Sequence, residues 1–341
     1  MENRKVILDV KELQTTFFTD SGKVPAVDHV SFHVKEGEVL GIVGESGCGK
    51  SVTSLSIMGL VPSPPGKIEG GEILFENKDL TTMSERDMRK IRGNEIAMIF
   101  QEPMTSLNPL FTIGNQMVEA ILLHEKKWSK KQARERAIEM LKLVGLPRTE
   151  DIMKEYPHQL SGGMRQRVMI AMALVCNPKV LIADEPTTAL DVTIQAQILK
   201  LMKELNTRLN TAVLLITHDL GVVAETCERV IVMYAGQIIE EAPVKTIFEN
   251  AQHPYTKGLI QSVPDMREKK DRLYSIAGNV PIPGTVKTGC RFAARCEFAF
   301  DRCFNENPPL YETSNVQQTR CFLYDEKGVE ANDNNEAVIK S

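Results

Sequence analysis

The sequence contains no uninterrupted apolar run of the roughly 18 residues that a helix needs to cross a bilayer. Its first residues, Met1 to Ile7, contain no apolar stretch typical of a secretory signal. We therefore expect any membrane role to be peripheral. The chain also has no excess of positive charge, since its formal net charge is -4. Nucleic-acid binding depends on many Lys and Arg side chains meeting phosphates, so we expect no nucleic-acid partner.

Closely spaced cysteine pairs are also missing. The seven cysteines are an odd number without a Cys-x-x-Cys pair, which argues against a disulfide framework and favours a reducing cytoplasm. The usual zinc pattern is likewise absent. The C-terminal quarter contains Cys290, Cys296, Cys303 and Cys321. Their spacing alone favours free buried thiols, although soft thiolates can also hold a [4Fe–4S] cluster.

The length of 341 residues, with 42% hydrophobic and 25% charged residues, indicates a globular protein with one main domain and a smaller C-terminal module. Short apolar segments alternate with helical ones, which predicts an α/β domain with a largely parallel core sheet. Between residues 112 and 148 the pattern is helical, with a capping box at Ser129 and Gln132. Proline becomes frequent after about residue 241. We place a domain boundary near residue 250 and a flexible tail at 325–341. The strands are predicted at 6–10, 30–34, 39–43, 96–100, 180–183, 213–217 and 230–233.

A glycine-rich loop follows the apolar segment 40–43 and matches the P-loop pattern, in which four residues separate two glycines and Lys-Ser follows. In such a loop, backbone N–H groups and the start of the next helix face phosphate oxygens. Lys50 would reach the β- and γ-phosphates, and Ser51 would ligate Mg²⁺. The alternative is a chance glycine turn, which the flanking strand and helix disfavour. The predicted nucleotide-binding residues are Gly44, Ser46, Gly47, Cys48, Gly49, Lys50, Ser51 and Val52.

Two further segments could serve the same site. Asp184 and Glu185 end an apolar strand, so Asp184 could support Mg²⁺ and Glu185 could polarise a water; a solvated turn is an equal alternative. Ser161, Gly162 and Gly163 precede an apolar helical run and could form a second anion site at a helix start. An ordinary capped helix is the alternative there.

These motifs, in this order across about residues 7–245, resemble the ABC transporter ATPase family. Gln101 resembles the family's Q-loop glutamine, and residues 160–164 resemble its signature motif. Asp191 in Ala-Leu-Asp resembles the D-loop, and His218 the switch histidine. Phe17 resembles the aromatic residue that stacks on adenine, with Phe18 as the less favoured choice.

The resemblance implies an α/β P-loop ABC ATPase domain over residues 1–250. Its parts would be a mixed sheet core, an antiparallel β subdomain and a helical subdomain at about 105–178. It also implies that two cassettes dock head to tail, so that the Ser-Gly-Gly turn of one covers ATP on the other. Glu185 would be the general base and His218 would contact the γ-phosphate. Gln101 would join Ser51 and Asp184 around Mg²⁺ and couple the site to a membrane partner, bound near residues 101–110.

Residues 251–324 resemble the C-terminal extension of oligopeptide, dipeptide and nickel importer ATPases. The resemblance rests on His253 to Thr256, Pro281 to Gly284, Gly289 to Cys296 and Pro308 to Leu310, with Ala294 where the family commonly has proline. It implies a peptide importer with two permease subunits, a second cassette and an external binding protein, at the cytoplasmic face of the membrane. It also implies a [4Fe–4S] cluster on the four C-terminal cysteines. The alternatives are a nickel or other small-solute importer, a soluble ABC protein acting on nucleic acid or ribosomes, and a non-hydrolysing cassette.

Overall fold

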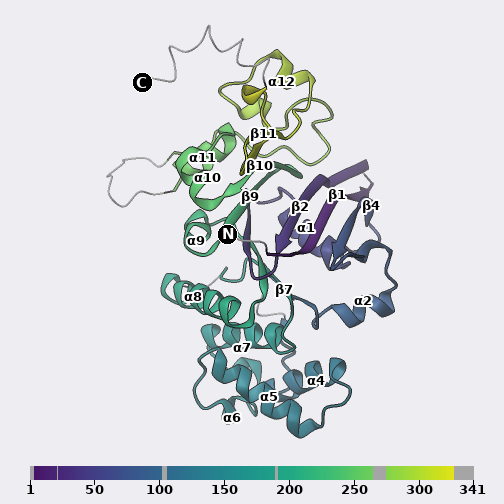
Figure 1. Ribbon diagram of the computed structural model, residues 1–341, viewed down its shortest axis with the longest axis vertical. Coiled ribbons are helices and arrows are strands. Elements are labelled where there is room, and N and C mark those ends of the chain that lie inside the picture. Colours follow the sequence, from purple (N-terminus) through teal and green to yellow (C-terminus); the bar gives the residue numbers. More distant parts are fainter. Residues whose placement is uncertain (1–3, 21, 102–105, 189–190, 264–273, 326–341) are drawn as a thin grey trace.

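The computed structural model describes residues 4–20, 22–101, 106–188, 191–263 and 274–325. The molecule is elongated, with a group of helices at one end and residues 274–325 at the other (Figure 1). Two β-sheets lie between these ends. The nucleotide-binding motifs therefore fall in the middle of the molecule, where the sheets and the helical end meet.

The larger sheet has the strand order β11-β12-β10-β9-β3-β8-β7-β6. From β9 to β6 the neighbouring strands are parallel, and β10, β12 and β11 add antiparallel pairs at one edge. Strands β3, β7 and β8 are buried along their whole length, which explains their continuous apolar sequences. The bounds are β3 Val39–Val43, β6 Ile96–Ile99, β7 Val180–Asp184, β8 Ala212–Ile216, β9 Arg229–Tyr234, β10 Gln237–Pro243, β11 Tyr311–Ser314 and β12 Gln317–Thr319. The predicted largely parallel core is confirmed.

The smaller sheet is antiparallel, with the order β2-β1-β4-β5. Its strands are β1 Val6–Thr19, β2 Gly22–Lys35, β4 Gly66–Phe75 and β5 Lys78–Asp79. Strands β1 and β2 are longer than the predicted apolar segments. One face of this sheet is exposed to solvent, so the strands also contain exposed polar residues such as Lys11 and Glu12. The helix α1, Lys50–Ile57, packs against this sheet, and the Ser56 and Thr15 hydroxyl oxygens lie 2.8 Å apart.

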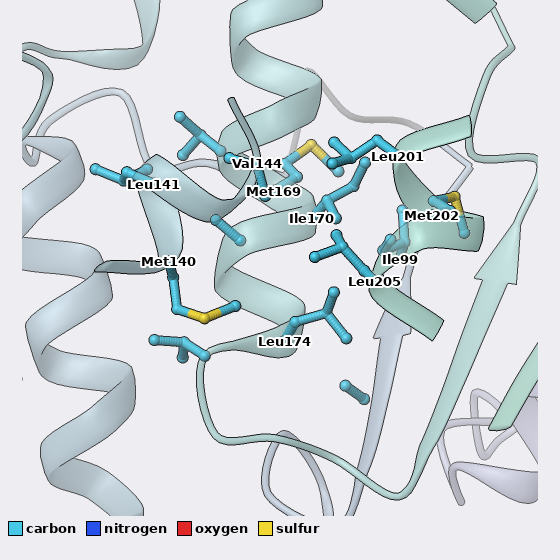
Figure 2. Close-up of a cluster of buried hydrophobic side chains, with 14 of the residues drawn as sticks. Ile99, Met140, Leu141, Val144, Met169, Ile170, Leu174, Leu201, Met202 and Leu205 are labelled. Atoms are coloured by element: carbon cyan, nitrogen blue, oxygen red, sulfur yellow. The ribbon is translucent and has the colours of Figure 1, made fainter. Parts of the chain in front are cut away.

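The helical end contains α4 Ile113–His124, α5 Lys130–Leu143, α6 Thr149–Ile152 and α7 Gly162–Leu174. Ser129 and Gln132 form the predicted capping box at the start of α5. Figure 2 shows how α7 is held: its apolar residues lie between those of α5 and those of α8, Val192–Leu209. The buried residues in contact there include Met140, Leu141, Met169, Ile170, Leu174, Leu201, Met202 and Leu205. The turn before α7 is therefore anchored to the sheet through one packed core.

The remaining described helices contain five to eight residues each. They are α2 Glu85–Ile91, α9 Leu220–Thr226, α10 Val244–Asn250, α11 Pro254–Gln261 and α12 Asp301–Asn305, with 3-10 turns at Leu80–Thr82, Pro157–Gln159, Ala293–Arg295 and Phe322–Tyr324. The C-terminal hairpin β11–β12 pairs with β10, with Glu240 opposite Thr319. It thereby continues the main sheet across the boundary that we place near residue 250, and that boundary stays a prediction. Within the described ranges, no helix is both long and apolar enough to span a bilayer.

Candidate nucleotide-binding site

The glycine-rich loop connects β3 to α1, and two of its glycines are required by their surroundings. Gly44 has φ 151 and Gly49 has φ 103. A Cβ on Gly44 would lie 2.3 Å from the Met233 carbonyl oxygen, and one on Gly49 would lie 2.5 Å from that of Ala26. Only glycine fits both the backbone angle and the space. The loop is therefore enclosed on one side by β9 and β2, while Ser46 and Gly47 are exposed at its tip.

The two polar residues that begin α1 have defined partners. The Lys50 ammonium donates to the carbonyl oxygens of Gly44, at 2.7 Å, and Glu45, at 3.1 Å. The Ser51 hydroxyl donates to Asp184 Oδ1 at 3.2 Å, across the sheet at the end of β7. Burial raises the pKa of the Asp184 carboxyl. Next to them, Cys48 is fully buried with its thiol pKa raised by burial, and Val52 packs against the core under the smaller sheet.

Glu185 is the centre of a second set of contacts. Its backbone has φ 47, a left-handed conformation that is uncommon outside glycine. One carboxylate oxygen lies 3.1 Å from His218 Nδ1, and the other accepts hydrogen bonds from Gln101 Nε2 at 3.0 Å and from the Thr188 hydroxyl at 3.0 Å. Gln101 and His218, which are far apart in the sequence, thus contact the same carboxylate as Thr188, next to the Ser51–Asp184 pair.

The charge on Glu185 is set by opposing effects. Burial favours the neutral acid, but the hydrogen bonds from His218 and Thr188 outweigh it, so the pKa of the Glu185 carboxyl is lowered. At neutral pH the group is an ionised acceptor, which suits a residue that polarises water. Thr188 is not among the site residues predicted from the sequence. Its only signal is a hydroxyl side chain three residues after the carboxylate, a common pattern that does not identify a site.

The Ser-Gly-Gly turn begins α7, and Ser161 is its N-cap, accepting a hydrogen bond from the Met164 N–H at 3.3 Å. Gly162 is exposed, with open space where a Cβ would stand, and Gly163 adjoins Ile194. Asp191 caps α8 through the Ile194 N–H at 2.9 Å, so the predicted D-loop residue lies beside this turn. Among the described residues, no hydrogen bond joins residues 161–163 to the P-loop of the same chain.

Other predicted site residues lie at the edges of this region. Phe17, in β1, is half-buried opposite Gly66, whereas Phe18 is exposed with the Lys23 ammonium 5.1 Å from its ring centroid. In the predicted membrane-partner loop, Leu110 is 79% exposed. Residues 102–105 of that loop and residues 189–190 of the D-loop lie outside the described residues.

The predicted iron–sulfur cluster is wrong. Cys290, Cys296, Cys303 and Cys321 line one cavity, but its volume is about 20 Å³, room for about one water. Within the described parts of the chain, no group of three or more His, Cys, Asp or Glu side chains is arranged to hold a metal ion. Burial raises the pKa of Cys296 to about 11 and that of Cys321 to about 12. All four cysteines are free and half-buried, in line with the free thiols that their spacing alone favoured.

The fold and the site together define the class of protein. In the parallel sheet, β3 leads into a glycine-rich loop and a helix, and β7, separated from β3 by β8, ends at Asp184 with Glu185 directly after it. The Ser51–Asp184 hydrogen bond joins the two segments. That arrangement is a P-loop nucleoside triphosphatase.

Comparison with known proteins defines the family. The ABC transporter model matches residues 27–188, and the model of the oligopeptide/dipeptide transporter C-terminal region matches residues 239–303. The oligopeptide transport ATP-binding protein AppD of Bacillus subtilis is 58% identical over 324 residues, which cover 95% of this chain and 98% of AppD. The dipeptide transport ATP-binding protein DppD of the same organism is 53% identical, with 95% and 97% covered.

Solved structures agree with this assignment. A dimeric bacterial ABC transporter cassette is 33% identical, with a TM-score of 0.62, and the match covers 70% of this chain and 98% of the cassette. A dimeric post-hydrolysis cassette bound to ADP and Pi is 32% identical, with the same TM-score and the same coverage. The chain belongs to the ABC transporter ATP-binding family, in the branch that carries the oligopeptide/dipeptide C-terminal region. It is an ABC-type ATPase, as the motifs predicted.

Proposed function

We propose that this chain is the ATP-hydrolysing subunit of an importer for dipeptides or oligopeptides. The observation that carries the proposal is the convergence of Gln101, Thr188 and His218 on Glu185, beside the Ser51–Asp184 pair. An ionised, oriented carboxylate at this position is suited to polarise a water for attack on a phosphate held by the P-loop.

The individual roles follow from the contacts. Lys50, which lies over the loop and donates to two of its carbonyl groups, turns toward the β- and γ-phosphates when ATP binds. Mg²⁺ would be held by Ser51 and Asp184, with Gln101 nearby; hydroxyl and carboxylate oxygens are ligands that this ion accepts alongside phosphate oxygens and water. The ion supplies charge neutralisation on the phosphates. His218 orients Glu185 and approaches the γ-phosphate.

The second half of the site comes from another cassette. Residues 161–163 are anchored in the helical end and have open space in front of Gly162, so they are free to cover ATP on a partner's P-loop. The dimeric state of the similar bacterial cassettes supports this arrangement. ATP then links the two cassettes, because it binds the closed pair better than the open one. Hydrolysis reverses that preference.

The membrane partners follow from the family. We infer two permease subunits, contacted by the exposed loop around Leu110, and an external binding protein that delivers the substrate. The chain would act peripherally at the cytoplasmic face of the membrane. The names of the relatives AppD and DppD and the C-terminal region model favour peptides as the substrate.

The test is to purify the intact membrane complex in proteoliposomes, with the external binding protein, and to measure ATP hydrolysis and uptake. A dipeptide and an oligopeptide are compared with a nickel complex. We expect peptide to stimulate ATPase activity and to accumulate only with ATP, while a Lys50→Ala complex does neither. Stimulation by nickel alone would replace peptide by metal as the substrate. Equal ATP binding by the parent and Lys50→Ala would refute the site itself.

A further inference from the structure

The C-terminal region, which we define as residues 251–324, contacts the P-loop directly. Arg295, in the 3-10 turn Ala293–Arg295, forms two hydrogen bonds to the carboxylate of Glu45, the second residue of the glycine-rich loop. One guanidinium nitrogen lies 2.8 Å from Glu45 Oε2 and the other 3.1 Å from Oε1. Such a two-point pair fixes orientation as well as charge. Residues separated by 250 positions in the sequence thus form one element of the nucleotide site.

The guanidinium of Arg295 is held from several sides. It also donates to the carbonyl oxygens of Ala277, at 2.8 Å, and Ile276, at 3.3 Å, and to the Tyr234 hydroxyl at 3.2 Å. Its side chain is only 5% exposed, while that of Glu45 is 32% exposed. The hydrogen bond to Glu45 raises the pKa of Arg295 above its already high value, so the group is always charged. A movement of the Arg295 guanidinium away from Glu45 would also break its hydrogen bonds to the carbonyl groups and to the Tyr234 hydroxyl.

The backbone of Glu45 is held by the same region. Its N–H donates to the Tyr255 hydroxyl at 2.9 Å, and Tyr255 is a fully buried residue of α11. The ring of Tyr255 packs edge-on against Tyr234 and Phe292, with centroids 4.7 Å and 5.5 Å away. An aromatic cluster formed by β9, α11 and the C-terminal residues therefore supports one end of the loop.

The charge of Glu45 makes this contact important. A carboxylate within a loop that must bind a polyphosphate repels the ligand, and the repulsion is strong in a partly dry site. The Lys50 ammonium, which could offset it, binds the Gly44 and Glu45 carbonyls and is required for the phosphates. Arg295 is the cation that the structure places on the Glu45 carboxylate.

We propose that Arg295 is a positioning residue of the nucleotide site: it neutralises Glu45 and holds it aside, so that the C-terminal region is needed for tight binding of the triphosphate. The inference rests on the proposed function, because it assumes that residues 44–51 bind ATP. It goes further by giving the C-terminal region a role in ATP affinity.

The test measures binding of the non-hydrolysable analogue AMP-PNP with Mg²⁺ to the full chain by calorimetry. We expect Arg295→Gln to weaken binding by about tenfold, the size of one lost charge-assisted contact. Glu45→Gln alone should bind within about twofold of the parent, and the double variant should recover to the level of Glu45→Gln, because the repelling charge is gone. Thermal unfolding confirms that each variant is folded.

Arg302→Gln is the matched control. Arg302 is another arginine of the C-terminal region, paired with Glu306 and Asp325 and stacked 4.0 Å from the Phe322 ring centroid. Within the described residues it forms no hydrogen bond or ion pair with residues 44–51. Its loss should leave nucleotide affinity unchanged. Parental affinity in Arg295→Gln, or a loss that Glu45→Gln does not restore, overturns the inference while leaving the proposed function intact. A parent that does not bind the analogue overturns both.

Discussion

The two glycine turns of this ATPase differ in how much of their environment one chain supplies. The P-loop is enclosed: Gly44 and Gly49 touch neighbouring backbone, Lys50 and Ser51 have partners, and Glu45 is held by Arg295. The turn at residues 161–163 is also anchored, through the packed residues of α7, but there is open space where a Cβ of Gly162 would lie. The difference indicates that one chain preorganises the P-loop, whereas the Ser-Gly-Gly turn is left open to contact a nucleotide on a partner chain.

Substitution of the proposed base, Glu185, should have the largest effect on ATP turnover. In Glu185→Gln the side chain keeps its shape but cannot polarise water, so we expect turnover in the assembled complex to fall by at least about 10²-fold. The nucleotide should then trap a closed dimer in which both turns are engaged. Steady-state ATPase and size-exclusion chromatography with ATP measure the two effects. Glu204→Gln, at an exposed position of α8, is the control, and near-normal ATPase in Glu185→Gln would refute Glu185 as the base.

The open turn is tested next by Gly162→Asp. A carboxylate in the first turn of α7 favours the helix, so the free energy of unfolding should change by less than about 1 kcal/mol. Facing a triphosphate on another chain, the same charge should weaken ATP-driven dimerisation by about 10²-fold, since like charges at an interface cost several kcal/mol. Analytical ultracentrifugation in a Glu185→Gln background measures the dimer. Undiminished dimerisation would show that this turn does not cover the partner's nucleotide, and Gly162→Ala controls for size without charge.

The enclosed turn is tested by a pair of glycine substitutions. Both Gly47 and Gly49 have positive φ, so alanine at either position costs about 1–2 kcal/mol in backbone strain. Only at Gly49 does the new Cβ also meet a backbone oxygen, at 2.5 Å. Gly49→Ala should therefore lower the free energy of unfolding by at least about 1 kcal/mol more than Gly47→Ala. Urea titration measures both, and equal losses would contradict the enclosure of the loop by Ala26.

The smallest expected effect is on the pH dependence of ATP hydrolysis. Hydrogen bonds keep the pKa of Glu185 low, and the base works only when ionised. Removing the Thr188 hydroxyl in Thr188→Val raises that pKa, so the acid limb of the kcat/KM profile should move to higher pH, by less than about one unit. Thr207→Val, an exposed threonine of α8, should leave the limb in place. An unmoved or lowered limb in Thr188→Val would show that this hydroxyl does not tune Glu185.

Local motifs were predictable to the extent that their residues are contiguous. The P-loop and the capping box at Ser129 lie within single short segments, and the conformation of each depends on its own backbone and nearest neighbours. The placement of Gln101 and His218 at one site was predictable only through a family resemblance, because it depends on the order of strands in the sheet. The contact of Thr188 with Glu185 was not predicted. The roles assigned to these residues stay predictions until they are tested by substitution.

The C-terminal quarter gave the least reliable interpretation. The family resemblance implied a [4Fe–4S] cluster on the four cysteines of residues 290–321, where the structure has half-buried free thiols around a small cavity. Cysteine spacing alone, which favoured free thiols, does not report distance. The contact of Arg295 with Glu45 had no signal in the sequence, because an arginine and a glutamate 250 positions apart are one pair among many. Burial and partner choice are properties of the packed chain.

By itself, the sequence determined the class of this protein, an ABC-type ATPase with a peptide-importer C-terminal region, because glycine, lysine and carboxylate positions along short segments specify phosphate chemistry. Tertiary structure alone decided which side chains form hydrogen bonds and ion pairs with one another. It also decided how the C-terminal hairpin extends the main sheet and which of the two glycine turns stays open to solvent. The physical reason is range: backbone angles and helix caps act over a few residues, whereas desolvation, ion pairing and strand order depend on segments that only folding brings together.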